Sequence, residues 1–315
     1  MRIVMSILWM TGILAVLEIV RELHSFKATR YRVSSAKLAG LRSTRKIIFL
    51  SDLHNYCYGR DNDTLFHAIE KERPDLILVG GDMLLRSDGN DYRGTARFLS
   101  RLTDICKVYC ANGNHEQKLK EQPWRYEQSY QEYKALLVKA GIHLLENESD
   151  EFEWDEARIR VTGLEIPMKA YEHVRRDRLK VREIEERIGE SKAAYEILLA
   201  HHPAYTKIYQ EWGADLILCG HYHGGVIGIP GVGGVIAPDF TLFPRYSGGC
   251  YPVGNAAAVV SRGLGAHSVP VRLLNPAEIV VIELVESENI LYNNKIAMKE
   301  SIGEDDGDSG KTAGL

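Results

Sequence analysis

Short apolar runs, each followed by turn or polar residues, recur through the middle of this 315-residue chain. A run of this length with such an ending is typical of a strand that is buried on both faces. The runs are Ile47–Leu50, Leu76–Val79, Val108–Ala111, Ile197–Ala200 and Leu216–Cys219, and further strands are expected within 142–163, at Ala256–Val260 and at Ile279–Leu284. The segment Gly224–Gly234 is rich in glycine and predicts a loop.

Between the apolar runs, apolar residues recur three and four positions apart, as they do along one face of a helix. These faces are Leu65, Ala68 and Ile69 before Pro74; Thr95, Phe98, Leu99 and Leu102; Tyr126, Tyr130, Tyr133 and Leu137 before Gly141; and Val181, Ile184 and Ile188 within the charged segment Tyr171–Ser191. We interpret the aromatic stripe as core packing rather than as a platform for a ligand. Strands alternating with helices predict an α/β fold.

The N-terminal segment is mostly apolar from Ile3 to Val20, close to the roughly 20 residues that span a bilayer. No small-residue cleavage site follows it, so we expect residues 1–30 to hold an uncleaved membrane anchor; a packed or amphipathic helix is the alternative. Basic residues are concentrated after the segment, which predicts a cytoplasmic catalytic domain, with the extracytoplasmic side left open. We expect the catalytic domain to cover residues 45–290 and a disordered tail to cover 301–315.

Net charge and cysteine count limit the classes of partner and site that this chain can have. The net charge of −4 shows no basic excess, so a nucleic-acid duplex is not expected as a partner. The five cysteines form no CxxC pair, which disfavours a zinc ribbon and favours unpaired thiols in a reducing compartment.

Metal-type ligands follow each of the five apolar runs. The segments are Asp52-Leu-His54, Gly81-Asp82, Gly113-Asn-His-Glu116, His201-His-Pro203 and Gly220-His-Tyr-His223. Because sites in α/β proteins form beyond the carboxyl ends of strands, we expect these side chains to converge. An extended backbone would place Asp52 and His54 on one side, and likewise His221 and His223. Glycines at 81, 113 and 220 would allow sharp turns.

The mixture of carboxylate, imidazole and amide ligands suits Mn, Fe, Zn, Co or Ni better than Ca or Mg. No thiolate accompanies them, which disfavours a structural zinc site. Each short motif alone is common in unrelated proteins. The ordered set of five, each after a buried strand, predicts a site for divalent transition-metal ions.

This ordered set resembles the calcineurin-like metallophosphoesterase superfamily. Three further segments, Phe243–Gly249, Val260–Gly265 and Pro276–Ile279, resemble its bacterial, often membrane-attached branch related to UDP-2,3-diacylglucosamine hydrolases. The resemblance covers about residues 45 to 285. It implies a four-layer α/β/β/α sandwich, in which two mixed β-sheets are flanked by helices, preceded here by the N-terminal hydrophobic helix.

The resemblance also implies roles for individual residues. One metal would be held by Asp52, His54 and His223, the other by Asn114, His201 and His221, with Asp82 bridging both. His115 would act on the phosphate or the leaving oxygen as a catalytic residue beside Asp82. Asn55, Tyr222 and Arg262 are weaker candidates for substrate contact. Members of that branch often read Gly-His-Thr-His-Gly-Gly-Gln at this motif, whereas this sequence has Tyr222 in the place of Thr and Val226 in the place of Gln.

Two divalent ions, for which Mn is the first candidate, would lower the pKa of a water that they share. The resulting hydroxide would attack phosphorus in line. We therefore expect a phosphoesterase that cleaves a phosphodiester or pyrophosphate bond. A membrane anchor would favour a lipid-linked substrate. One alternative is a soluble nucleotide or phosphomonoester hydrolase. Another is a non-catalytic scaffold of the same fold, although the complete set of ligands argues against it.

Overall fold

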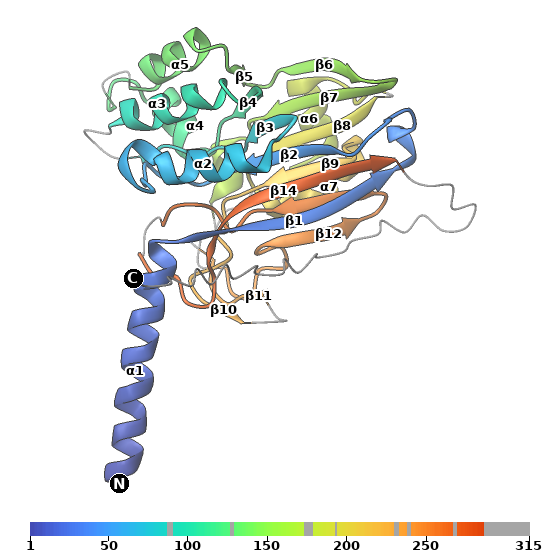
Figure 1. The fold of residues 1–315 in the computed structure, drawn as a ribbon. Coiled ribbons are helices and arrows are strands. Elements are labelled where there is room, and N and C mark those ends of the chain that lie inside the picture. Colours follow the sequence, from blue (N-terminus) through green and yellow to red (C-terminus); the bar gives the residue numbers. More distant parts are fainter. Residues whose placement is uncertain are drawn as a thin grey trace, which may run out of the picture.

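Two six-stranded sheets pack face to face and helices cover both outer faces (Figure 1). The computed structural model describes residues 1–86, 91–126, 129–172, 179–192, 194–229, 233–237, 241–266 and 270–286. The expected tail at 301–315 lies outside these residues. The four layers confirm the fold predicted from the resemblance.

The first sheet has the order β1-β14-β2-β3-β4-β5. Its members are β1 (Phe26–Ser35), β14 (Ala277–Glu286), β2 (Arg45–Leu50), β3 (Leu76–Val79), β4 (Lys107–Ala111) and β5 (His143–Leu145). Only the β14–β2 pair is antiparallel, so the carboxyl ends of β2, β3 and β4 meet at one edge. The loops after these three strands carry four of the seven predicted metal ligands.

The second sheet has the order β12-β13-β9-β8-β7-β6. Its members are β12 (Gly249–Val253), β13 (Ala256–Val260), β9 (Leu216–Cys219), β8 (Tyr195–Ala200), β7 (Ala157–Leu164) and β6 (Ser149–Trp154). The four central strands β13, β9, β8 and β7 are parallel, and both outer pairs are antiparallel. The carboxyl ends of β8 and β9 supply the remaining histidines.

Three apolar clusters explain the layering. Between the sheets, buried side chains such as Phe49 and Leu218 interdigitate. Helices α2 (Asp63–Glu72), α3 (Tyr92–Leu102), α4 (Asn114–Glu121) and α5 (Ser129–Lys139) pack on the first sheet, and α6 (Val181–Ile188) and α7 (Thr206–Trp212) on the second. Short 3-10 turns lie at η1 (Ala36–Leu38), η2 (Arg60–Asn62), η3 (Met168–Tyr171) and η4 (Pro203–Tyr205).

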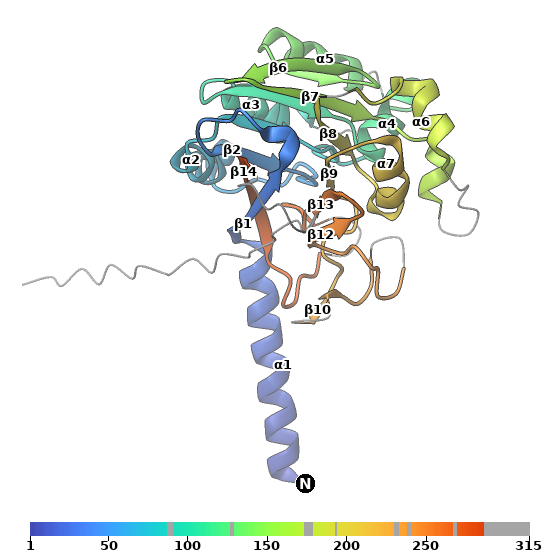
Figure 2. The ribbon, with the colours of Figure 1, turned by 90° about the vertical axis from the view of Figure 1, so that its right-hand side faces the viewer.

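Helix α1 (Arg2–Leu23) projects away from the sandwich, as the second view shows (Figure 2). None of its apolar window is buried in the protein, and its length and composition would allow it to cross a membrane. Its last turn is anchored, because buried Glu22 accepts a hydrogen bond from the backbone N–H of Asn275 at 3.0 Å. Strand β1 starts at Phe26, directly after the helix.

Several elements differ from the sequence predictions. The segment Phe26–Ser35 holds three basic residues and no continuous apolar run, yet it forms β1 because β14 offers a parallel partner along all ten residues. Strand β12 and helices α4 and α7 were not predicted either. The aromatic helix begins at Ser129, so Tyr126 precedes it. Part of the Gly224–Gly234 loop forms a small hairpin, β10 (Gly228–Ile229) with β11 (Gly233–Gly234).

Candidate metal centre

The predicted ligands converge from both sheets, as expected for side chains that follow neighbouring strand ends. Three groups of side chains offer ligand atoms that all lie within 4.8 Å of one another. The groups are Asp52, His54 and His223; His54, Asp82 and His115; and Asp82, His201 and His221. All of these side chains except half-buried His221 are buried. Water therefore does not solvate their charges, which must be balanced by one another or by a bound ion.

The backbone around the ligands is not extended, and the prediction that it would be was wrong. Asp52 and His54 have φ of 55° and 49°, and His221 and His223 have φ of 69° and 52°. Asp82 has a φ of 52°. The left-handed conformation costs non-glycine residues roughly 1–3 kcal/mol each and persists only where the surroundings enforce it. Curled turns, rather than extended segments, aim these side chains at one point.

All three predicted glycines are required by close approaches between the ligand loops. A Cβ on Gly81, whose φ is +91°, would lie 2.1 Å from the backbone nitrogen of Gly113. A Cβ on Gly220 would lie 2.2 Å from a carboxylate oxygen of Asp52. Larger residues here would therefore push the ligand loops apart.

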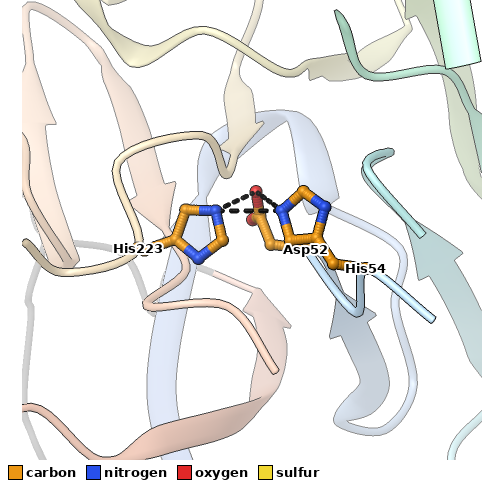
Figure 3. Close-up of side chains that lie close together, drawn as sticks. All are labelled: Asp52, His54 and His223. Carbon is orange, nitrogen blue, oxygen red and sulfur yellow. Dashed lines mark hydrogen bonds and ion pairs between the residues drawn. The ribbon is translucent and has the colours of Figure 1, made fainter. Parts of the chain in front are cut away.

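The first group centres on the carboxylate of Asp52 (Figure 3). Its Oδ1 lies 3.2 Å from Nε2 of His223 and 4.0 Å from Nε2 of His54, and the two Nε2 atoms are 3.1 Å apart. Its orientation is held by the backbone N–H of His221, at 3.0 Å, and by the hydroxyl of Ser51, at 2.6 Å. Three ligand-type atoms thus face one another across a small space.

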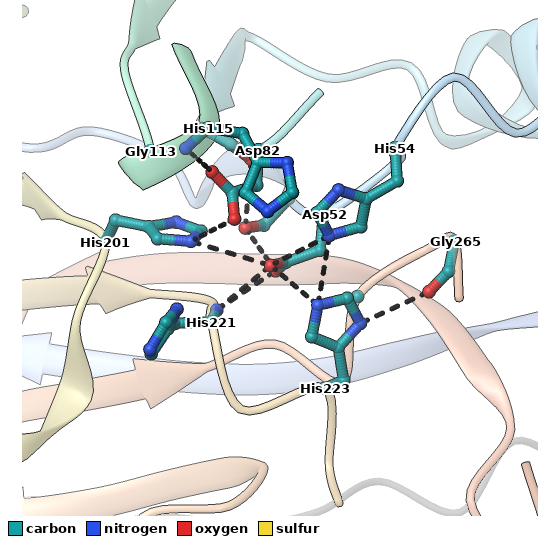
Figure 4. Close-up of polar contacts among 12 residues, drawn as sticks. Asp52, His54, Asp82, Gly113, His115, His201, His221, His223 and Gly265 are labelled. Atoms are coloured by element: carbon teal, nitrogen blue, oxygen red, sulfur yellow. Dashed lines mark hydrogen bonds and ion pairs between the residues drawn. The ribbon is translucent and has the colours of Figure 1, made fainter. Parts of the chain in front are cut away.

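The second group is built around Asp82 and His201 (Figure 4). Asp82 Oδ2 lies 3.1 Å from His201 Nε2, which is also 3.6 Å from Oδ1 of Asp52. The other Asp82 oxygen accepts the backbone N–H of His115 at 2.8 Å. The buried amide oxygen of Asn114 has no hydrogen-bond partner in the described part of the chain, which is the condition of a ligand atom awaiting a cation.

Backbone partners determine which ring nitrogen of each histidine carries a proton. Nδ1 of His201 lies 2.8 Å from the carbonyl of Gly80, and Nδ1 of His223 lies 3.2 Å from the carbonyl of Gly265. Since a carbonyl only accepts, Nδ1 carries hydrogen in both rings, and Nε2 is the atom that can ligate. His115 is the reverse, because its Nδ1 accepts the N–H of Arg86 at 2.8 Å.

The charges of the centre shift its pKa values strongly. Burial alone would raise the pKa of Asp52 and Asp82, but neighbouring imidazoles outweigh it and hold both pKa values below the usual range. Burial would lower the pKa of His201, but the two carboxylates overcome it and raise the pKa to about 10. Burial and the neighbouring His223 lower the pKa of His54. Dense compensating charge of this kind is common at functional sites.

Glu116 is a structural part of the centre that the sequence motif contained without assigning it a role. Its buried carboxylate accepts the backbone N–H groups of Asp82 and Leu84 at 2.8 Å and of Gly113 at 3.0 Å. It therefore ties the loop after β3 to the loop after β4. The signal that could have found it is a carboxylate three residues into a helix that begins at a ligand loop.

Arg272 and Asn275 also support the centre, and no local motif marked either. The buried guanidinium of Arg272 donates to the carbonyls of Arg262 and Gly265 at 2.9 and 2.8 Å. The amide of Asn275 donates to the carbonyl of His223 at 2.6 Å. Both residues lie far from the ligands in sequence, so only the fold brings them there.

The three weaker candidates lie near the centre in packed surroundings. Asn55 accepts a hydrogen bond from the hydroxyl of Thr95 at 2.9 Å. Tyr222 is buried, and its ring lies 5.6 Å from that of His221. Arg262 forms an ion pair of 2.9 Å with buried Glu278. Substrate contact by these residues stays a prediction.

The fold and the buried Asp/His cluster fit a metal-dependent hydrolase, and sequence comparison agrees. Residues 45–225, more than half of the chain, match the calcineurin-like phosphoesterase family. The chain belongs to this family, whose members use divalent metal ions. It is therefore a hydrolase of phosphoric esters.

Two relatives cover most of the chain. The protein is 29% identical to phosphodiesterase YaeI of Escherichia coli (strain K12), over 76% of this chain and 82% of the relative. It is 26% identical to the uncharacterized metallophosphoesterase YkuE of Bacillus subtilis (strain 168), over 84% and 87%. Among solved structures, phosphopantetheinyl hydrolase from Mycobacterium tuberculosis aligns with a TM-score of 0.43 and 12% identity, over 69% of this chain and 88% of that one.

Proposed function

We propose that the protein hydrolyses a phosphodiester or pyrophosphate bond at a centre of two divalent transition-metal ions. The observation that carries the proposal is the contrast among buried histidines: His201 and His223 keep hydrogen on Nδ1 and so direct Nε2 toward a metal, whereas Nδ1 of His115 accepts a hydrogen bond and its Nε2 carries the proton. Ligands and a proton donor therefore lie side by side. This is the combination that metal-assisted ester hydrolysis needs.

The residues present fit two ions. Asp52, His54 and His223 would hold the first, and Asn114, His201 and His221 the second, with Asp82 serving both; the second set includes the buried Asn114 oxygen that has no hydrogen-bond partner in the described chain. Ions bound there supply Lewis acidity and lower the pKa of a ligated water. Mn is the first candidate and Fe, Zn, Co and Ni are the others, because imidazole and carboxylate share the site.

His115 is placed to donate a proton or a hydrogen bond during bond cleavage. With Nδ1 occupied by the N–H of Arg86, its proton resides on Nε2. The ring lies 4.8 Å from the ring of His54, and its backbone N–H holds Asp82. The Nε2–H can thus stabilise charge that develops on a phosphoryl oxygen or on the leaving oxygen.

The His115→Gln variant tests this assignment. We expect kcat for bis(p-nitrophenyl) phosphate with Mn²⁺ to fall about 10²- to 10⁴-fold, because a general acid is lost. Metal content, measured by mass spectrometry of the purified protein, should stay at the wild-type value. His143→Gln, on the half-exposed end of β5, is the matched control and should leave kcat unchanged. Loss of metal from H115Q would instead make His115 a ligand, and unaltered kcat would remove its catalytic role.

The diester or pyrophosphate class is supported by the relative YaeI, which is named a phosphodiesterase, and by the segments that resemble UDP-2,3-diacylglucosamine hydrolases. Turnover of bis(p-nitrophenyl) phosphate well above that of the monoester would support a diesterase. The reverse ratio would favour the nucleotide or phosphomonoester alternative. Absence of both activities in the metal-loaded protein would leave a scaffold.

We further propose that α1 anchors the protein in a membrane, with the catalytic domain on the cytoplasmic side and a lipid-linked substrate within reach. The supporting features are the exposed apolar surface of α1 and the basic residues that follow it. Deleting residues 2–17 spares Glu18, which pairs with Arg21, and buried Glu22.

The truncated protein is expected to move from the membrane pellet to the soluble fraction while keeping its kcat on bis(p-nitrophenyl) phosphate. Replacing residues 2–17 by a Leu-Ala segment of equal length should restore sedimentation with the membrane. A truncated protein that still sediments with membranes would contradict the anchor.

A further inference from the structure

Exposed apolar side chains gather at one place on the catalytic domain. Outside α1 and Met1, eight large apolar residues are exposed in the described part of the chain, and five of them belong to three loop segments. The five, called here the apolar loop surface, are Ile227, Ile229, Leu242, Phe243 and Leu274, with exposed fractions of 38 to 65%. A soluble surface scatters such residues singly, so their concentration indicates a contact surface.

Backbone hydrogen bonds join the three segments into one unit. The N–H of Gly228 donates to Leu273 at 2.9 Å, which connects β10 to the segment of Leu274. The N–H of Phe243 donates to Val235 at 2.8 Å, and that of Val235 donates to Ile227 at 2.9 Å. The apolar loop surface is therefore a connected structure rather than a set of independent loops.

This unit adjoins the end of α1. Asn275, next to Leu274, donates its backbone N–H to the carboxylate of Glu22 in the last turn of the helix. In both views the β10–β11 hairpin lies on the side of the domain from which α1 projects, level with the C-terminal end of the helix (Figures 1 and 2).

We propose that the apolar loop surface enters the interface of the same bilayer that α1 spans. The inference rests on the membrane anchoring proposed above. The 22 residues of α1 make a helix of about 33 Å, close to a hydrocarbon core of about 30 Å, so its end stands at headgroup level. Segments beside that end then meet lipid rather than bulk water.

Charge around the surface favours lipid over a protein partner. Lys27, just after the end of α1, and Arg245, two residues beyond Phe243, are exposed, as is Arg21, which pairs with Glu18. Cations that border an apolar surface attract anionic headgroups while the apolar side chains enter the acyl boundary. The apolar loop surface is bordered by basic residues and adjoins a membrane helix. We therefore expect it to contact a bilayer that contains anionic lipid.

The contact would also set the position of the metal centre. The side chain of Asn275 donates to the carbonyls of His223 and Gly225 at 2.6 and 2.5 Å. One residue therefore touches the anchor helix through its backbone and the ligand loop through its side chain. The ligand loop is held at a constant height above the lipid, as cleavage of an amphiphile's phosphoester requires.

Fluorescence of an indole placed in the surface tests the proposal. Full-length F243W is placed, one chain per disc, in nanodiscs of phosphatidylethanolamine and phosphatidylglycerol. Its emission spectrum is compared with that of the wild type in the same discs, so that the difference isolates the added indole. We expect blue-shifted emission and about twofold quenching by lipids brominated near the headgroup end of the acyl chain. K139W, on the exposed side of α5, is the matched control and should show neither. L242W repeats the measurement if F243W fails to fold.

The outcomes separate this inference from the anchor. Native Trp9 lies in α1, so the part of the wild-type quenching by brominated lipids that W9F removes reports that the helix is in the bilayer. Quenched Trp9 with a water-exposed added indole would overturn the apolar contact and leave the anchor standing. A blue shift without lipid quenching would show that a protein surface, such as a second copy, covers the loops. Unquenched Trp9 would overturn both.

Discussion

The Asp82→Asn variant is expected to lose about a thousandfold or more in kcat on bis(p-nitrophenyl) phosphate. Asp82 belongs to two of the three ligand groups and lies 3.1 Å from His201. The substitution removes a negative charge from a buried centre in which imidazoles outnumber carboxylates. Each metal would lose a shared ligand, and the protonated ring of His201 would lose its nearest carboxylate partner.

Asp155→Asn is the matched control, because Asp155 is a carboxylate paired with Arg45 at a turn far from the centre. Its kcat and metal content should equal those of wild type. For D82N, metal analysis should show that at least one ion is lost even when the protein is folded by circular dichroism. A D82N protein with full metal content and kcat within tenfold of wild type would contradict the bridging role.

The second large effect is the pH dependence of the metal-free protein. The pKa of His201 is raised to about 10, so its contribution to stability is fully present below its unfolded value of about 6.5 and is lost as the pH rises toward 10. Burial first, and then the charge of Asp82, raise the pKa of Glu116 to about 7, which removes stability in the same direction as the pH rises through neutrality.

Asp52 and Asp82 act with the opposite sign. Their pKa values are lowered by the imidazoles around them, so their contribution is present above pH 4 or so and is lost in acid. The Tm of protein treated with a chelator should therefore be highest between about pH 4.5 and 6.5 and should fall as the pH approaches 10. A Tm that rises steadily from pH 6 to 10 would contradict these assignments.

Metal binding should reverse this dependence. An ion on His201 Nε2 must replace the proton that Asp82 and Asp52 retain there, so at pH 8 about one proton should be released per chain. Titration calorimetry with Mn²⁺ in two buffers of different ionisation enthalpy measures that number. Mn²⁺ at a thousandfold its Kd should add about 4 kcal/mol to the free energy of unfolding. Binding without proton release would show that His201 is neutral before the ion arrives.

The convergence of the candidate ligands was predictable because each of them follows a strand that can be recognised in the sequence. Asp82 follows four apolar residues and two glycines, and no alternative local structure buries that run as well. His115, by contrast, could be separated from the ligands only by resemblance. Its distinguishing contact, the N–H of Arg86, comes from a segment 29 residues away and leaves no local pattern.

The backbone at the ligands shows where sequence patterns stop. Spacing suggested that Asp52 and His54 share one side of an extended segment, yet both adopt left-handed conformations. The backbone N–H groups of both residues bond to carbonyls of the neighbouring loop, Asp52 to Gly81 and His54 to Asp82. Long-range hydrogen bonds therefore impose a conformation that local preference disfavours.

The sequence by itself determined the class of fold, the buried strands and the candidate ligands that the fold brings together, because hydrophobic periodicity and side-chain chemistry are local properties. The tertiary structure alone decided that Phe26–Ser35 is a strand, since that segment needs β14 as its partner. It also decided which histidine nitrogens carry protons, and that Asn275 links the end of α1 to the loop of His223. Those features depend on atoms brought together from distant parts of the chain, and no local pattern encodes them.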